Sequence, residues 1–104
     1  MPNSRLEILK SMMPQNPADS FSRYGLAMEY RNSGDLEAAA GEFHALIAAD
    51  PGYCYAYFHF GRMLEKQGRE EEARELYRAG VEAATKKGDR HALSELQGAL
   101  DLLG

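Results

Sequence analysis

The residues in this 104-residue chain that could do chemistry are a single cysteine and three histidines. The histidines are His44, His59 and His91, and no two of them stand at an HxxxH or HxH spacing. Cys54 and His59 are five residues apart, which places their side chains on different parts of one predicted helix. A zinc site built from Cys54, His59 and a carboxylate would lack the usual ligand spacing, so we predict no metal site.

The acidic residues give no better candidate for catalysis. Asp35 with Glu37, and the run at 70–72, each open a predicted helix, where the helix dipole favours negative charge. Opposite charges four residues apart predict a surface pair of Glu70 with Arg74. The sequence has no glycine-rich phosphate loop, nucleophile elbow or cofactor fingerprint. We therefore predict that the protein is not an enzyme and needs no cofactor.

Composition narrows the classes of partner. The chain is 44% hydrophobic and 27% charged with a formal net charge of −4, which is typical of a globular domain. An acidic domain repels phosphate backbones, so nucleic acid is not expected as a partner. No apolar run approaches the roughly 20 residues of a membrane span, and no secretory signal is present. One cysteine excludes an internal disulfide and favours a reducing, cytoplasmic location.

The chain repeats itself with a period of 34 residues. Pro17 and Pro51 are 34 residues apart, and so are Gly34 and Gly68, each inside a predicted turn. Apolar residues recur at the i, i+3, i+4 and i+7 spacing of helices, and no segment alternates as a strand would. Each period therefore predicts two helices. Bulky positions match bulky ones and small match small between the periods: Tyr24 with Phe58, Ala27 with Gly61, Ala39 with Ala73, Phe43 with Tyr77.

Two further helices are predicted at the flanks. Leu9 precedes Phe43 by 34 residues, so its segment is interpreted as the second helix of a truncated preceding repeat. At the other end Asp89 is expected to cap a helix, and Gln97 stands where a repeat needs a small residue, as suits a terminal cap. The predicted layout is a single domain over 1–104, with an N-terminal helix at 4–13, repeat one at 18–51, repeat two at 52–85 and a capping helix at 89–103.

This pattern resembles the tetratricopeptide repeat (TPR). The second repeat carries the family's residues at Tyr57, Phe60, Gly61, Leu64, Ala73, Tyr77 and Gly80. The first departs at Arg23, where a bulky apolar residue is usual, and at Leu46, where a small one is. We expect Phe21 and Tyr24 to compensate for Arg23. The resemblance implies an all-α fold, an α-solenoid of antiparallel helix pairs in a right-handed superhelical stack with a C-terminal capping helix.

The resemblance also implies that the protein binds a peptide or partner protein in a concave groove lined by the first helix of each repeat. The family's carboxylate clamp for chaperone tails is missing, because Tyr24, Met28 and His59 stand at its lysine and asparagine positions. An aromatic and Met-rich surface with two arginines remains, which suits a segment bearing apolar or aromatic side chains. The predicted binding residues are Phe21, Tyr24, Met28, Arg31, Tyr55, Phe58, His59 and Arg62, with Glu65 beside them.

Two alternatives to this adaptor hypothesis stay open. The aromatic side chains could pack on one another as ordinary core. The chain could also be a homo-oligomerising structural module, a homodimer in the simplest case, with Met12–Met13 or Leu102–Leu103 in the contact. The sequence fits both a stand-alone bacterial protein and a fragment of a larger one, and it does not name the partner.

Overall fold

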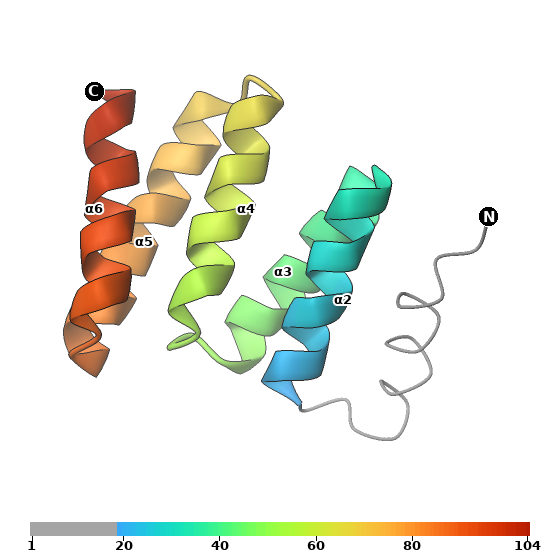
Figure 1. Ribbon diagram of the computed structural model, residues 1–104, viewed down its shortest axis with the longest axis horizontal. Helices are drawn as coiled ribbons and strands as arrows, with labels where there is room; N and C mark the ends of the chain where they lie inside the picture. Colours follow the sequence, from blue (N-terminus) through green and yellow to red (C-terminus); the bar gives the residue numbers. More distant parts are fainter. Residues whose placement is uncertain (1–18) are drawn as a thin grey trace. The chain divides into compact units, whose positions relative to one another are not determined.

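The computed structural model describes residues 19–104, and these form five α-helices and no strand (Figure 1). The predicted helix at 4–13 lies outside the described residues. The prediction of an all-α fold built from antiparallel helix pairs is confirmed. The helices are α2 (Ser20–Ser33), α3 (Leu36–Ala49), α4 (Cys54–Lys66), α5 (Glu70–Lys87) and α6 (Arg90–Leu103).

The chain divides into two compact units, Met1–Asp50 and Pro51–Gly104. The first unit contains α2 and α3, and the second contains α4, α5 and α6.

The turns that follow α2 and α5 have the same structure, a left-handed glycine followed by a capping aspartate. Gly34 has φ 91° and Gly88 has φ 73°, a left-handed conformation that glycine adopts without the steric cost of a Cβ. An aspartate comes next in both turns: Asp35 accepts a hydrogen bond from the Ala38 amide at 3.2 Å, and Asp89 from the Ala92 amide at 3.0 Å. The predicted helix ends and the predicted cap at Asp89 are confirmed.

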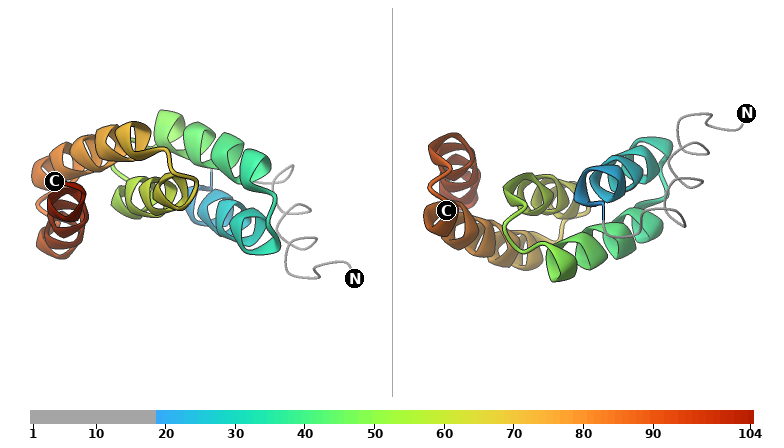
Figure 2. Two further views of the ribbon diagram at one scale, coloured as in Figure 1. Left: turned by 90° about the horizontal axis from the view of Figure 1, so that it is seen from above. Right: turned by 90° about the horizontal axis from the view of Figure 1, so that it is seen from below.

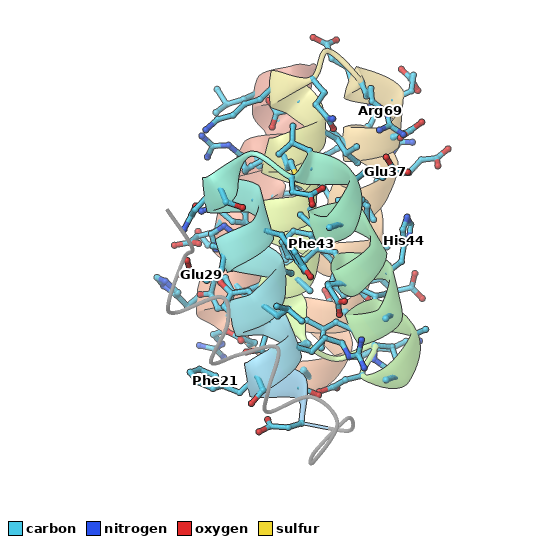
Figure 3. The ribbon with its side chains drawn as sticks, turned by 90° about the vertical axis from the view of Figure 1, so that its right-hand side faces the viewer. Phe21, Glu29, Glu37, Phe43, His44 and Arg69 are labelled. Carbon is cyan, nitrogen blue, oxygen red and sulfur yellow. The ribbon has the colours of Figure 1, made fainter. Side chains whose placement is uncertain are left out.

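In the first unit α2 and α3 pack together around Phe43, which is fully buried between them (Figure 3). The hydroxyl of Ser20 donates to Asp50 Oδ2 at 2.7 Å and so ties the start of α2 to the end of α3. Arg23 reaches from α2 to Glu42 on α3, with Nη1 and Oε1 2.8 Å apart. The expectation that Phe21 compensates for Arg23 is wrong, because Phe21 is 75% exposed at the first turn of α2. The ion pair with Glu42 occupies this place between the helices instead.

In the second unit α4 and α6 lie on the same side of α5 (Figure 2). Glycine permits the close approach of these helices at two points. A Cβ added to Gly61 would lie 2.9 Å from two ring carbons of Tyr77. A Cβ added to Gly80 would lie 2.8 Å from Tyr57 Cβ and 2.7 Å from a methyl carbon of Leu96. The expected need for a small residue where the paired helix approaches is confirmed at Gly61.

Helix α6 packs on α5 through Ala92, Leu96 and Ala99, which are buried. Gln97 is exposed and donates to Asp101 Oδ1 at 3.0 Å. Its side chain therefore meets solvent at the position where a complete repeat would bury a small residue.

The prediction that Arg74 pairs with Glu70 is wrong. Arg74 pairs with Glu71, one turn earlier on α5. Its other terminal nitrogen donates to the carbonyl of Leu103 at 3.4 Å, so the side chain is directed toward the end of α6. Among the helices described, none is both long enough and apolar enough to cross a membrane.

Candidate partner-binding surface

Four of the eight predicted binding residues belong to α2 in the first unit. Phe21 lies at the first turn and projects away from the helix pair (Figure 3). Tyr24, Met28 and Arg31 follow along the helix and are half-buried. The guanidinium of Arg31 donates to Asn32 Oδ1 at 3.0 and 3.3 Å, which holds it against the C-terminal end of α2.

The other four predicted residues lie on α4 in the second unit, at the i, i+3, i+4 and i+7 positions that share one helix face. We call Tyr55, Phe58, His59 and Arg62 the α4 stripe. The apolar packing of this helix is made by other residues, since Tyr57, Phe60, Gly61 and Leu64 are buried. Three members of the α4 stripe are half-buried and Arg62 is exposed. The ring of Phe58 also lies 6.4 Å from the ring of the buried Tyr77.

The rings of the α4 stripe contact one another. His59 meets Phe58 edge-on with ring centroids 5.2 Å apart, and it lies 6.5 Å from the ring of Tyr55. The guanidinium carbon of Arg62 stands 5.8 Å from the Phe58 centroid, within the range of a cation–π contact. These contacts hold the side chains in place, so less rotamer entropy remains to be lost when a ligand binds.

Helix α6 contributes two residues that sequence reasoning missed. The ring of His91 lies 6.3 Å from that of Tyr55, and its Nε2 is 3.1 Å from Glu95 Oε1. The sequence pattern predicted α6 as a capping helix, with none of its residues in the binding site. A signal was available, because Leu93, Leu96 and Leu100 follow the apolar spacing of a first helix. That spacing predicts that α6 packs on α5 as the first helix of a next repeat would, beside α4.

Two tyrosines of this unit have raised pKa values. Burial raises the pKa of Tyr77 first, and a hydrogen bond from its hydroxyl to Glu65 raises it further. Burial also raises the pKa of Tyr55, and the nearby carboxylates Glu95 and Asp89 add to the shift. Both phenols therefore remain protonated donors at neutral pH.

A separate hollow of about 460 Å³ lies beside the loop that precedes α4. Two hydrogen bonds shape it: Tyr57 Oη donates to the Pro51 carbonyl at 2.6 Å, and Lys87 Nζ donates to the Gly52 carbonyl at 3.2 Å. None of the eight predicted residues lines it. Within residues 19–104, no three His, Cys, Asp or Glu side chains converge as metal ligands.

The family model of the tetratricopeptide repeat matches residues 24–87, more than half of the chain. This chain belongs to the tetratricopeptide-repeat family. The TPR match spans most of α2 and all of α3, α4 and α5.

Known proteins resemble the chain over most of its length. A TPR repeat-containing protein of Pseudomonas aeruginosa is 28% identical over 91 residues, which are 88% of this chain and 87% of that protein. The solution structure of a tetratricopeptide repeat domain protein from Salinibacter ruber is 36% identical, with a TM-score of 0.80, and the match covers 84% of this chain and 88% of that one. The solution structure of a protein from Bordetella parapertussis is 31% identical, with a TM-score of 0.79, over 94% of this chain and 85% of that one.

Membership of this family indicates a general role for the chain. TPR domains are in general modules for protein–protein interaction and are generally not catalytic. Which residues of this TPR chain would contact a partner is a separate question, because fold alone does not assign a site.

Proposed function

We propose that this protein is a small adaptor that binds a peptide segment or partner protein through half-buried and exposed first-helix residues of its two repeats. The proposed repeats are 18–51 and 52–85, within a single domain. The proposed contact residues are those of the α4 stripe together with Phe21, Tyr24, Met28 and Arg31 on α2. The single cysteine suits a cytoplasmic site of action.

One observation carries this proposal: the α4 stripe holds three half-buried rings and an exposed arginine, while the fully buried residues of α4 are others. Aromatic side chains and arginine are the residue types enriched where proteins bind one another. Scattered exposed apolar residues would mean little, but these four share one helix face and contact each other.

The first experiment is affinity capture from the native cell extract, comparing the wild type with the Tyr55→Ala/Phe58→Ala variant. We expect the wild type to retain a protein that the variant loses, because the variant removes two of the rings that a ligand would cover. His44→Ala is the matched control, since His44 is an exposed ring on α3. Circular dichroism and thermal unfolding are used to check that both variants are folded. Equal capture by a folded double variant would remove the α4 stripe from the binding site.

The alternative function is self-association, and the exposure of Leu102 favours it. This side chain is 90% exposed near the end of α6, where a second copy of the chain could cover it. Sedimentation equilibrium at high protein concentration tests it, with Leu102→Ser as the comparison. A strictly monomeric wild type would rule out this reading and leave the adaptor.

A further inference from the structure

We propose that a second copy of this chain docks on the outer side of α6, antiparallel to the first α6, in a two-fold dimer held by two ion pairs between Arg90 and Asp101. This inference goes beyond the proposed adaptor function, because it concerns a different surface and does not depend on the α4 stripe. It follows from the positions of these two charges on a helix face that is open in the second unit.

The side of α6 turned away from α5 is hollowed. Helix α6 packs on α5 through its buried residues, and Figure 1 shows it as the outermost helix of the second unit. A hollow of about 480 Å³ lies along its other side. Its lining residues stand at i, i+3, i+4, i+7, i+8 and i+11, the spacing of one helix face. We call these six residues the outer face: Arg90, Leu93, Ser94, Gln97, Gly98 and Asp101.

The two charges of the outer face stand at the ends of α6 where the helix dipole opposes them. Arg90 is in the first turn, where a cation is disfavoured, and Asp101 is in the last turn, where an anion is disfavoured. Helix α5 has the favourable order, with glutamates in its first turn and lysines in its last. A partner that brought a carboxylate to Arg90 and a cation to Asp101 would relieve both conflicts.

Neither charge is paired within one copy. Among residues 19–104, no ion pair includes Arg90 or Asp101. Asp101 accepts a hydrogen bond from Gln97 through Oδ1, and a carboxylate has a second oxygen that can accept from a guanidinium. Near Arg90, Asp89 caps the helix at an amide and Glu95 pairs with a histidine. The guanidinium of Arg90 is therefore available to a carboxylate of a second chain.

Arg90 and Asp101 match each other across a two-fold axis. They are eleven residues apart (101 − 90), which at about 100° per residue is about 20° more than three full turns, so both lie along one line of the helix. An antiparallel copy centred on the same point places its Asp101 level with Arg90 and its Arg90 level with Asp101. The two ion pairs then stand about 16 Å apart, one at each end of the contact. A parallel copy would bring like charges together, which opposes binding.

The other residues of the outer face fit the same arrangement. A two-fold axis in the plane of the contact brings Ser94 and Gly98 of both copies to one edge, and Leu93 and Gln97 of both copies to the other. The first edge is small: a Cβ added to Gly98 meets no atom within 4 Å, so a second helix has room to approach there. On the second edge the half-buried Leu93 gains an apolar neighbour in its own counterpart.

The size of this contact sets the expected affinity. One face of a 14-residue helix buries less than the roughly 1,200 Å² at which standard interfaces begin. We therefore expect a weak dimer, with a Kd on the order of 0.1 mM. His91, which adjoins Tyr55, is not part of the outer face. The α4 stripe of each copy would therefore remain open to a partner.

The experiment is sedimentation equilibrium of the full chain, from about 10 μM to 1 mM, with charge reversals in the outer face. Arg90→Asp and Asp101→Arg each bring like charges together twice in a homodimer, so each should raise the Kd about tenfold or more. An equimolar mixture of the two variants should dimerise like the wild type, because each contact then joins one cation to one anion. Arg78→Asp, at an exposed position on α5, is the matched control and should leave the Kd unchanged.

A further variant tests the close approach without changing a charge. Gly98→Gln should raise the Kd severalfold, because its side chain occupies the space that the second helix needs. It should not unfold the chain, since nothing within one copy lies within 4 Å of the new Cβ. Gly41→Gln is the matched control on α3, where an added Cβ is equally open, and it should leave the Kd unchanged. Circular dichroism checks that each variant is folded.

Three results would overturn the inference: a wild type that is monomeric at 1 mM, a dimer that neither charge reversal weakens, or two weakened variants whose mixture does not recover. These are distinguishable from failure of the proposed function, because the Tyr55→Ala/Phe58→Ala variant leaves the outer face intact. A monomeric wild type that still captures a protein through the α4 stripe would leave the adaptor function standing and remove only the dimer.

Discussion

The two helix pairs of this protein use the same 34-residue plan with different chemistry where their helices meet. In the second unit Tyr57 lies against Gly80, where an added Cβ would come within 2.8 Å of Tyr57 Cβ. The corresponding positions of the first unit hold Arg23 and Leu46. Arg23 extends to Glu42 at 2.8 Å, and the position that corresponds to Glu42 in the second unit is Leu76.

This difference shows what a repeat position requires. Where the second unit has Tyr57 and Leu76, the first has Arg23 and Glu42, and both units keep a packed antiparallel helix pair. The replacement is tolerated because the Arg23 and Glu42 side chains keep 22% and 25% of their surface exposed, so neither charge is fully desolvated. The position held by Arg23 and Tyr57 therefore accepts either a charged or an aromatic side chain, provided that the side chain is long enough to reach the paired helix.

The largest expected loss of stability comes from removing the buried aromatic ring that each helix pair has at the same repeat position. Phe43 and Tyr77 are equivalent and fully buried, so Phe43→Ala and Tyr77→Ala should each lower the free energy of unfolding by about 3–5 kcal/mol. Chemical denaturation measures the loss, with Leu102→Ala as an exposed control that should change little. A loss below about 1 kcal/mol at one ring would show that its unit does not depend on this position.

The next test concerns the glycines of the second unit. Gly80→Ala should destabilise the protein by about 1–3 kcal/mol, because the new Cβ overpacks against Tyr57 and Leu96. Gly41→Ala and Gly98→Ala are matched controls on α3 and α6, where a new Cβ meets no atom within 4 Å. Alanine favours helix over glycine, so the controls should gain about 0.5–1 kcal/mol. Stabilisation by all three changes would contradict the close approach at Gly80.

A smaller effect is expected from the ion pair of the first unit. A double-mutant cycle of Arg23→Ala and Glu42→Ala should give a coupling of about 0.2–1 kcal/mol, discounted for partial exposure and weaker in high salt. The same cycle at Tyr57 and Leu76 should be insensitive to salt, because no charge is removed. Similar salt dependence in both cycles would break the contrast between the two pairs.

The smallest expected effect is a pH dependence of the free energy of unfolding, which the hydroxyl of Tyr77 causes and the equivalent Phe43 cannot. The pKa of Tyr77 is raised in the folded protein by burial and by Glu65, while an unfolded tyrosine titrates at about 10. Above that pH the unfolded chain loses the proton first, so stability falls as pH rises through about 10. Tyr77→Phe should fall less steeply than the wild type in denaturation curves from pH 8 to 11, and parallel curves would refute the assignment. Some decline should remain, since the pKa of Tyr55 is raised too.

Most of the secondary structure could be predicted because its signals are local. Glycines followed by capping aspartates end and restart helices through contacts within a few residues, as at Gly34 with Asp35 and Gly88 with Asp89. Predictions that depended on a side chain's partner were weaker. Phe21 proved exposed, and Arg74 pairs with Glu71 in place of Glu70, because several partners lie within reach of a long side chain and packing selects among them.

The candidate surface was predictable in part. The family pattern assigned the α4 stripe from the spacing of its residues on one helix face, and in the structure three of these side chains are half-buried and Arg62 is exposed. The contribution of His91 and Glu95 could not be predicted, since it depends on α6 folding back beside α4.

The sequence by itself determined the helices, their turns and the family, because periodicity, glycine conformation and capping act over a few residues and recur every 34. Only the tertiary structure decided which residues share an environment. It paired Arg23 with Glu42, directed Phe21 to solvent and brought the first turn of α6 to Tyr55. These outcomes depend on distances between helices, which are set by how side chains fill the space between them and which no local pattern records.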